Sequence, residues 1–447
     1  MKQAWFKNTI NIASLFSFRM LGLFLLIPVF TVFANNLSNA TPAMVGFALG
    51  AYGLTQSISQ IPFGILSDKY GRKPIISIGF ILLLIGSLIG AYTTSIEGMI
   101  LARSLQGTGA IGSVLIALLS DLTNDSDRTK SMAVIGSTIG ISFSIAIILG
   151  PYITRLFGLP GIFELTAILA VLGLIITHSI IPSPKKINLN TNKVKFKEIL
   201  FNKHLMRLNV GIFFQHFLLT ATFFAIPLLL QEQVKSNNLN SLWHFYLPLV
   251  IGSFLLMVPA IVFAERKNKI KIIFNLSVLV TLLAQIFLYF TYNSFSFVCV
   301  FMFLYFVAFN ILEANLPSIV SRQANMNNRG SAMGIYSSCQ FLGIFAGGSM
   351  AGLLFQWNGY QAIFLFNTLI SFIWYIISWF MQPTNYQLIV SIPYASKIND
   401  INQLTKQLGS LAGVCHALIN EQDKVIHLRV KKSLYIDGSA EKLFPNH

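Results

Sequence analysis

The chain has 447 residues, of which 54% are hydrophobic and only 10% are charged. An ordinary soluble domain carries about 25% charged residues, so this chain has too few charges to cover a water-exposed surface. Its 31 Lys and Arg residues against 15 Asp and Glu residues give a net charge of +16. The composition disfavours a soluble enzyme and an intrinsically disordered chain, and it predicts a protein embedded in a lipid bilayer.

The basic residues are divided among short clusters between apolar runs, whereas nucleic-acid-binding proteins gather Lys and Arg on one face of a soluble domain. We therefore expect no nucleic-acid partner. The three cysteines stand far apart without metal-ligand spacing, which predicts neither a disulfide framework nor a metal site, and we expect no cofactor. The N-terminal segment runs into a long apolar stretch, as a retained first membrane span would.

Apolar runs long enough to cross a bilayer recur along the chain, since a transmembrane helix needs about 20 apolar residues. We predict an all-α membrane protein of twelve transmembrane helices, at residues 10–34, 43–66, 74–93, 97–121, 131–153, 161–181, 206–230, 242–264, 270–290, 295–320, 330–354 and 360–381. The loops on one side hold only two basic residues, Arg155 and Lys235, whereas those on the other side hold many. By the positive-inside rule, both termini lie in the cytoplasm.

The longest connection in the membrane part, at residues 182–205, predicts a cytoplasmic linker between two six-helix halves, residues 1–181 and 206–382. An offset of 201 residues aligns the RTKSM segment at Arg128 with RGSAM at Arg329, and it aligns Gly158 with Gly359. Two matches at one offset predict a pseudo-symmetric repeat of the halves. Such transporters bind their solute between the repeats, near the middle of the membrane.

The connection between the second and third spans reads GILSDKYGRKP, from Gly64 to Pro74. Its glycines permit a tight turn, and Asp68 and Arg72 are spaced to pair on one helical face. Asp121, at the end of the fourth span, is a second acid within reach. We expect a gating latch that is paired when the halves close and separated when they open; alternatively, the basic residues Lys69, Arg72 and Lys73 only fix the topology.

This segment resembles the signature of the major facilitator superfamily, which Gly64, Asp68, Gly71, Arg72 and Lys73 match. The LARSLQGTGAIGS segment resembles the second signature of that family. Three further blocks, which begin at Phe18, Ala117 and Ile335, resemble the YajR-type inner-membrane transporters. The resemblance implies proton-coupled secondary transport by alternating access, in which Asp68, Arg72 and Asp121 stabilise the outward-open state. We also count Arg128 among the gating residues.

Ionisable groups inside the membrane need a partner or a wet cavity, since each costs about 2.5–3.5 kcal/mol on insertion scales. Glu313, in the tenth span, is the first candidate for a proton carrier, and a structural hydrogen bond is the alternative. His216 is a titratable alternative. Arg103, next to Gln106, is a structural or coupling candidate by the family resemblance. Arg19 is a further candidate, although snorkelling from near the cytoplasmic end of its span explains it equally well.

Beyond residue 384 the pattern changes to that of a small soluble domain, at residues 385–447. YQLIVSIPY, VCHALIN and VIHLRVKK read as strands, and INDINQLTKQLGSL has helical spacing. This β-α-β-β order resembles the α+β ferredoxin-like domain that follows the last span in YajR-type proteins, here truncated. A weaker latch in the second half is expected at Glu265 and Arg266.

These features predict a secondary active transporter in a bacterial inner membrane, and not an enzyme. We expect it to move a small organic solute, drug-like or a metabolite, by alternating access with proton-coupled efflux. The expected partners are the solute, protons and membrane lipid, and the expected state is a monomer. Two alternatives remain open: an uncoupled facilitator, and a degenerate carrier that acts as a sensor through its cytoplasmic domain.

Overall fold

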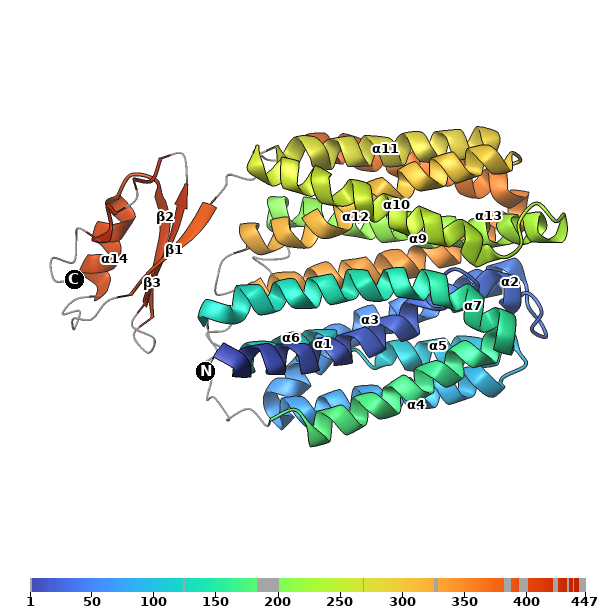
Figure 1. Cartoon of the computed structure of the whole chain (residues 1–447), viewed down its shortest axis with the longest axis horizontal. Coiled ribbons are helices and arrows are strands. Elements are labelled where there is room, and N and C mark those ends of the chain that lie inside the picture. The colour runs from blue at the N-terminus through green and yellow to red at the C-terminus, as the bar shows by residue number, and fades with distance from the viewer. Residues whose placement is uncertain are drawn as a thin grey trace. The chain divides into compact units, whose positions relative to one another are not determined.

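The computed structural model describes residues 2–123, 125–182, 201–267, 269–324, 329–381, 387–393, 401–420, 425–431, 434–436 and 438–441. The chain divides into two compact units (Figure 1). The first comprises Met1–Glu265 and Ile272–Met381, and the second comprises Arg266–Lys271 and Gln382–His447. Most of the linker predicted at residues 182–205 lies outside the described residues.

The first unit consists of long helices that run side by side (Figure 1). The helices before the linker are α1 (Lys2–Phe24), α2 (Phe30–Ala34), α3 (Pro42–Tyr70), α4 (Arg72–Tyr92), α5 (Ile96–Thr108), α6 (Gly112–Leu122) and α7 (Asp125–Ser179). Those after it are α9 (Lys203–Lys235), α10 (Leu242–Arg266), α11 (Ile270–Thr291), α12 (Phe295–Gln323) and α13 (Arg329–Trp379).

The apolar runs form helices that leave an apolar face unburied, as a lipid-facing helix does. In α4, the side chains of Ile78, Ile81, Ile85 and Leu88 recur at helical spacing and are more than 40% exposed, while Phe80 and Leu83 on the other face are buried. Eight stretches of the described residues are long and apolar enough to cross a membrane. The chain is therefore a multi-pass membrane protein.

Two of these stretches, Lys130–Ser179 and Gly330–Trp379, have 50 residues each. At 1.5 Å per residue each would measure about 75 Å, more than twice the thickness of the hydrocarbon core. Each is bent within its length, at Gly158 (φ 67°, ψ −168°) and at Gly359 (φ 61°, ψ −146°). Both glycines have a positive φ, which side chains disfavour, and they are the pair that the offset of 201 aligns.

Two predicted spans are not single helices. The first, expected at 10–34, is split into α1 and α2 by turns around Pro28, a residue that lacks an N–H for the helix. The fourth, expected at 97–121, is split into α5 and α6 by Gly109, Ala110 and Ile111, which lie between Thr108 at the end of α5 and Gly112 at the start of α6. The prediction missed both breaks because it relied on the length of the apolar run.

The two halves of the first unit meet along α3 and α13, which pack antiparallel. A Cβ atom on Gly46 would lie 2.7 Å from the Cα of Gly352, and one on Gly50 would lie 2.7 Å from the carbonyl oxygen of Phe345. Only glycine allows backbones to approach this closely. Farther along, the Ser57 hydroxyl donates to the Ser338 carbonyl at 3.0 Å, so the contact extends over about half of α3.

The described residues of the second unit form a three-stranded antiparallel sheet and one helix. The chain order is β1 (Gln387–Pro393), α14 (Ile401–Ser410), β2 (Val414–Asn420) and β3 (Val425–Lys431), and the order in the sheet is β1-β3-β2. Both outer strands pair antiparallel with β3 and are therefore parallel to each other, which is a split β-α-β arrangement. Its core is formed by buried side chains, among them Ile392, Leu408, Ile426 and Leu428. A complete ferredoxin-like fold has a second helix and a fourth strand, and the assignment to a truncated form of that fold stays a prediction.

Candidate functional site

The ion pair predicted between Asp68 and Arg72 forms at the turn between α3 and α4. Gly71 ends α3 and precedes α4 with a φ of 98°, a conformation that glycine adopts without strain. This turn brings Arg72, the first residue of α4, next to Asp68 in the last turn of α3. A positive charge at a helix N-terminus and a negative charge at a helix C-terminus both interact unfavourably with the helix dipole. The ion pair between them offsets both.

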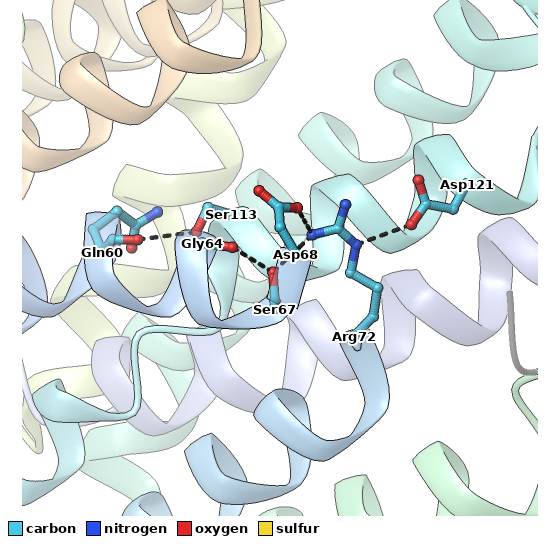
Figure 2. Close-up of polar contacts among 7 residues, drawn as sticks. All are labelled: Gln60, Gly64, Ser67, Asp68, Arg72, Ser113 and Asp121. Atoms are coloured by element: carbon cyan, nitrogen blue, oxygen red, sulfur yellow. Dashed lines mark hydrogen bonds and ion pairs between the residues drawn. The ribbon is translucent and has the colours of Figure 1, made fainter. Parts of the chain in front are cut away.

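Arg72 lies between two carboxylates (Figure 2). Its Nε donates to Oδ2 of Asp121 at 2.9 Å, and its Nη1 forms an ion pair with Asp68. Nη1 also donates to the Ser67 hydroxyl at 2.7 Å, which in turn donates to the Gly64 carbonyl. The side chain of Asp68 is 56% exposed, whereas that of Asp121 is 21% exposed. The pair with Asp121 is therefore the less screened of the two.

We call Asp68, Arg72 and Asp121 the latch, and the end of the first unit that carries it the latch end. All three latch residues belong to the first half of the chain, where they join α3 and α4 to α6. They are paired although none of them bridges the two halves, so the expected pairing on closure of the halves stays a prediction. Lys73 forms no ion pair with a described residue, and the side chain of Arg128 lies outside what the structure describes. Ser67 was missed by the sequence reasoning, although it is the residue directly before Asp68.

Glycines near the latch end lack the close contacts seen at the other end of α3. A Cβ on Gly64 would meet only Ser113 Oγ, at 3.8 Å, and one on Gly136 or Gly140 of α7, or on Gly330 or Gly334 of α13, would meet no described atom within 4 Å. Among the described glycines of α3, the close backbone contact with the other half therefore runs from Gly46 to Gly53 and does not reach Gly64.

The second half carries a smaller ion pair in the corresponding place. Nη2 of Arg322, at the end of α12, donates to Oε1 of Glu265, at the end of α10, at 3.0 Å. The expected partner of Glu265 was Arg266, so that prediction is wrong: the residue next in sequence on a helix points to a different face. Both partners are more than one third exposed.

Glu313 and His216 were separate candidates, and the structure brings them together. Oε2 of Glu313 on α12 lies 3.8 Å from Nε2 of His216 on α9, and it accepts a hydrogen bond from Gln215 at 2.9 Å. Nε2 of Gln340 on α13 lies 2.8 Å from Nε2 of His216. We call these four residues the central polar cluster. Gln215 and Gln340 were missed, although the adjacent Gln215 and His216 interrupt an apolar run.

Arg103 is buried in the first half and lies against polar and aromatic partners. Its Nη1 donates to Oε1 of Gln106 at 2.9 Å, and Nε2 of Gln106 donates to the Ser87 hydroxyl at 2.9 Å. The guanidinium carbon lies 4.9 Å from the centre of the Tyr52 ring, within the range of a cation–π contact. The predicted neighbour Gln106 is thus its direct partner.

Arg19 is 2% exposed, so its charge does not snorkel to water and that alternative is wrong. The prediction placed Arg19 near the end of a span that began at residue 10, whereas α1 begins at Lys2. The residue therefore lies about 26 Å along the helix. Its guanidinium carbon lies 5.8 Å from the centre of the Phe341 ring, on α13 of the other half.

Comparisons with known proteins agree with this architecture. The sequence profile of the Major Facilitator Superfamily matches residues 12–324 and 208–397. The chain is 38% identical over 430 residues to the inner membrane transport protein YajR of Escherichia coli K12, covering 95% of this chain and 94% of that protein. It is also 38% identical over 344 residues to an uncharacterized transporter of Buchnera aphidicola, covering 76% and 88% of the two chains.

Solved structures show the same fold. A crystal structure of a D-xylose–proton symporter superposes with a TM-score of 0.67 at 16% identity, over 84% of this chain and 98% of that one. A crystal structure of the nucleoside transporter NupG gives a TM-score of 0.64 at 18% identity, over 84% and 99%. Together with the helical unit and the match of the family profile, these relatives place the protein in a membrane and assign it the transport of a small solute; the chain belongs to the major facilitator superfamily.

Proposed function

We propose that this protein is a secondary active transporter that moves a small organic solute by alternating access. The observation that carries the proposal is the uneven contact between the halves. They are in backbone contact where Gly46 meets Gly352, while the glycines of the latch end have free space beside them. This is the packing expected of one end state of two halves that rock about a central site.

The proposal includes proton coupling through the central polar cluster. Glu313 and His216 are both titratable, lie on different helices and are 3.8 Å apart. A proton can reside on either residue, and its presence changes the attraction between α9 and α12. The coupling of protonation to helix position is what a proton-driven exchanger needs. Solute efflux is the proposed direction.

The proposed topology has twelve spans, with the latch end and both chain termini in the cytoplasm. Support comes from the bends at Gly158 and Gly359, which divide the two longest apolar stretches into two spans each. The basic residues of the loops give the orientation. We further propose that the second unit is a ferredoxin-like domain in the cytoplasm and that the protein works as a monomer.

Apolar rings beside the central polar cluster favour an amphiphilic solute. Phe143 of α7 lies 5.7 Å, between ring centres, from Phe309 of α12, and Phe309 lies 6.0 Å from the His216 ring. The aromatic surface thus continues from one half to the other next to ionisable groups. A solute with an apolar body and a polar or charged group would be complementary to both.

The test is a solute screen with the purified full chain in proteoliposomes that enclose a pH-sensitive dye. Proton movement that depends on the added solute, together with solute accumulation driven by an imposed pH gradient, is the expected result. Solute flux without proton movement would favour the uncoupled facilitator. Absence of flux for every class of solute, combined with ligand binding to the full chain, would favour the sensor.

A further inference from the structure

The break in the fourth span places a helix N-terminus inside the first unit. The helix α6 begins at Gly112, and its N-cap residue, Ile111, has no side chain that caps the helix. The N–H groups of Gly112, Ser113 and Val114 donate no hydrogen bond to a described residue, since the first bond of this helix runs from Leu115 to Ile111. These unpaired N–H groups carry the positive end of the helix dipole, which attracts anions.

A second observation points to the same place. The side chain of Arg19 is 2% exposed, and its Nε and Nη2 atoms have no hydrogen-bond partner among the described residues. No described carboxylate forms an ion pair with it. Its Nη1 lies 3.0 Å from the position that a Cβ on Gly112 would occupy. The guanidinium therefore points to the first residue of α6.

Gln60 adds a third donor. Its Nε2 lies 3.7 Å from the same Cβ position on Gly112. Its Oε1 accepts a hydrogen bond from Gln56 at 2.8 Å, so the Gln60 amide is oriented with its N–H groups available. Ser113 bonds to the Gln60 backbone at 3.3 Å, which ties α6 to α3 at this point (Figure 2). Because Gly112 has no side chain, Arg19 and Gln60 can both approach the N-terminus of α6.

No carboxylate of the described residues compensates the charge of Arg19. A buried charge without an opposite charge costs several kcal/mol. The guanidinium of Arg19, the amide of Gln60 and the N-terminus of α6 all donate hydrogen bonds, so they favour a ligand group that accepts them. Oxyanions such as carboxylate and phosphate accept several such bonds at once. The Phe341 ring beside Arg19 lies 6.2 Å from the Tyr52 ring, so an apolar surface from both halves adjoins the donors.

We propose that Arg19, Gln60 and the N-terminus of α6 bind the oxyanion group of an organic solute, whose apolar part lies against Tyr52 and Phe341. This inference rests on the proposed transport function and names the chemical class of its substrate. Because α1, α3 and α6 belong to one half and Phe341 to the other, a solute bound here contacts both halves. Movement of one half relative to the other would therefore change the contacts of a solute bound at this site.

The experiment measures binding to the purified full chain in detergent, by calorimetry at constant ionic strength. The probes are benzoate, phenyl phosphate, inorganic phosphate, benzyl alcohol and benzylamine, with chloride as the background anion. We expect benzoate or phenyl phosphate to bind. Tighter binding of benzoate would indicate a solute with a carboxylate group, and tighter binding of phenyl phosphate would indicate a solute with a phosphate group. Benzyl alcohol and benzylamine should bind at least about tenfold more weakly, since they lack the charge that Arg19 recognises.

Three variants test the residues. Arg19→Gln should weaken binding of the preferred anion by about tenfold or more, and Arg19→Lys should restore part of it. Gly112→Ala would place a Cβ 3.0 Å from Arg19 Nη1. It should weaken binding by crowding the guanidinium at the helix N-terminus while the charge of Arg19 is kept. Arg155→Gln is the matched control, since Arg155 is exposed, and it should bind as the wild type does.

Unchanged affinity in Arg19→Gln and Gly112→Ala would overturn the proposal, as would the absence of binding of both aromatic anions to the wild type. Equal affinity for inorganic phosphate and phenyl phosphate would overturn the assignment to an organic solute. Thermal unfolding of each variant shows whether it is folded. If Arg19→Gln does not fold, Gly112→Ala still tests the site. The measurement needs no membrane gradient, so a failure of coupled transport leaves its result intact.

Discussion

Asp121 and Arg322 lie 201 residues apart, and each forms an ion pair at the end of its helix, Asp121 on α6 with Arg72 and Arg322 on α12 with Glu265. The signs are reversed between the halves: the acid is on α6 in the first half, and the base is on α12 in the second. The same offset relates Gly158 to Gly359. The repeat therefore preserves the position of an ion pair where it has not preserved the residues.

The first prediction concerns the latch. Asp68→Asn and Asp121→Asn should each slow transport by about tenfold or more, because a hydrogen bond to a charged group is worth about 1.5–3 kcal/mol. The amount of protein inserted should be unchanged. Flux in proteoliposomes, normalised to inserted protein, is the measurement.

The matched control for the latch is Glu265→Gln. Both partners of its ion pair with Arg322 are more than one third exposed, whereas Arg72 in the latch is only 10% exposed. Exposed pairs contribute about 0–1 kcal/mol. We expect its flux to stay within about fivefold of the wild type. Near-normal flux in Asp68→Asn and Asp121→Asn, measured side by side with this control, would remove the argument for a latch.

The second prediction concerns the central polar cluster. Glu313→Gln should abolish solute accumulation driven by a pH gradient but retain exchange of solute for solute, because the amide keeps the hydrogen-bonding shape and cannot carry the proton. The measurement is uptake with and without the gradient across a range of pH. Glu232→Gln is the control, since Glu232 accepts a hydrogen bond from Tyr360 in an exposed position on the same helix as His216. A Glu313→Gln variant with the pH dependence of the wild type would exclude Glu313 as the proton carrier.

Most of the membrane architecture could be predicted from the sequence because lipid imposes one rule on every span: an apolar run of sufficient length forms a helix. The offset of 201 aligned Gly158 with Gly359, and the structure has a bend at both glycines. The break before Gly112 could not be predicted from run length, since residues 109–111 are as apolar as a continuous helix. At this break the backbone of Gly109 packs directly against Gly79 of α4: a Cβ on Gly109 would lie 2.5 Å from the Gly79 carbonyl oxygen.

The candidate site was predicted in part. The pairing of Asp68 with Arg72 could be predicted because the two residues are four apart in the chain, whereas Asp121 was proposed only from its place at the end of its span. The contact of Glu313 with His216, and that of Arg19 with Gly112, join helices far apart in the chain. A single sequence carries no signal for such contacts, beyond the cost of the charge that made Glu313 and Arg19 candidates at all.

The third prediction concerns the contact of α3 with α13. Gly46→Val should prevent the halves from closing at the end opposite the latch, because its side chain would overlap the backbone of Gly348 and Gly352. In a background with Cys299, Cys339 and Cys415 replaced by Ser, a cysteine pair at Ser57 and Ser338 should cross-link readily. The cross-link should form several-fold more slowly in Gly46→Val.

Gly136→Val is the control for this contact, since a Cβ at Gly136 has no described atom within 4 Å. It should cross-link at the rate of the parent. Equal rates in Gly46→Val and Gly136→Val would show that the backbone contact at Gly46 does not govern the closed state.

The last prediction concerns the bends at Gly158 and Gly359. Both have a positive φ, at 67° and 61°, and a side chain in that conformation costs about 1–2 kcal/mol. A lack of room for a side chain does not explain why these two positions are glycine. A Cβ on Gly158 would meet only Pro160, at 3.5 Å, and one on Gly359 would meet no described atom within 4 Å. Gly158→Ala and Gly359→Ala should therefore lower the thermal unfolding temperature by similar amounts. Gly140→Ala, within the regular helix of α7, should leave it unchanged or raise it. If only one of the two bend variants were destabilised, the two bends would not be equivalent parts of the repeat.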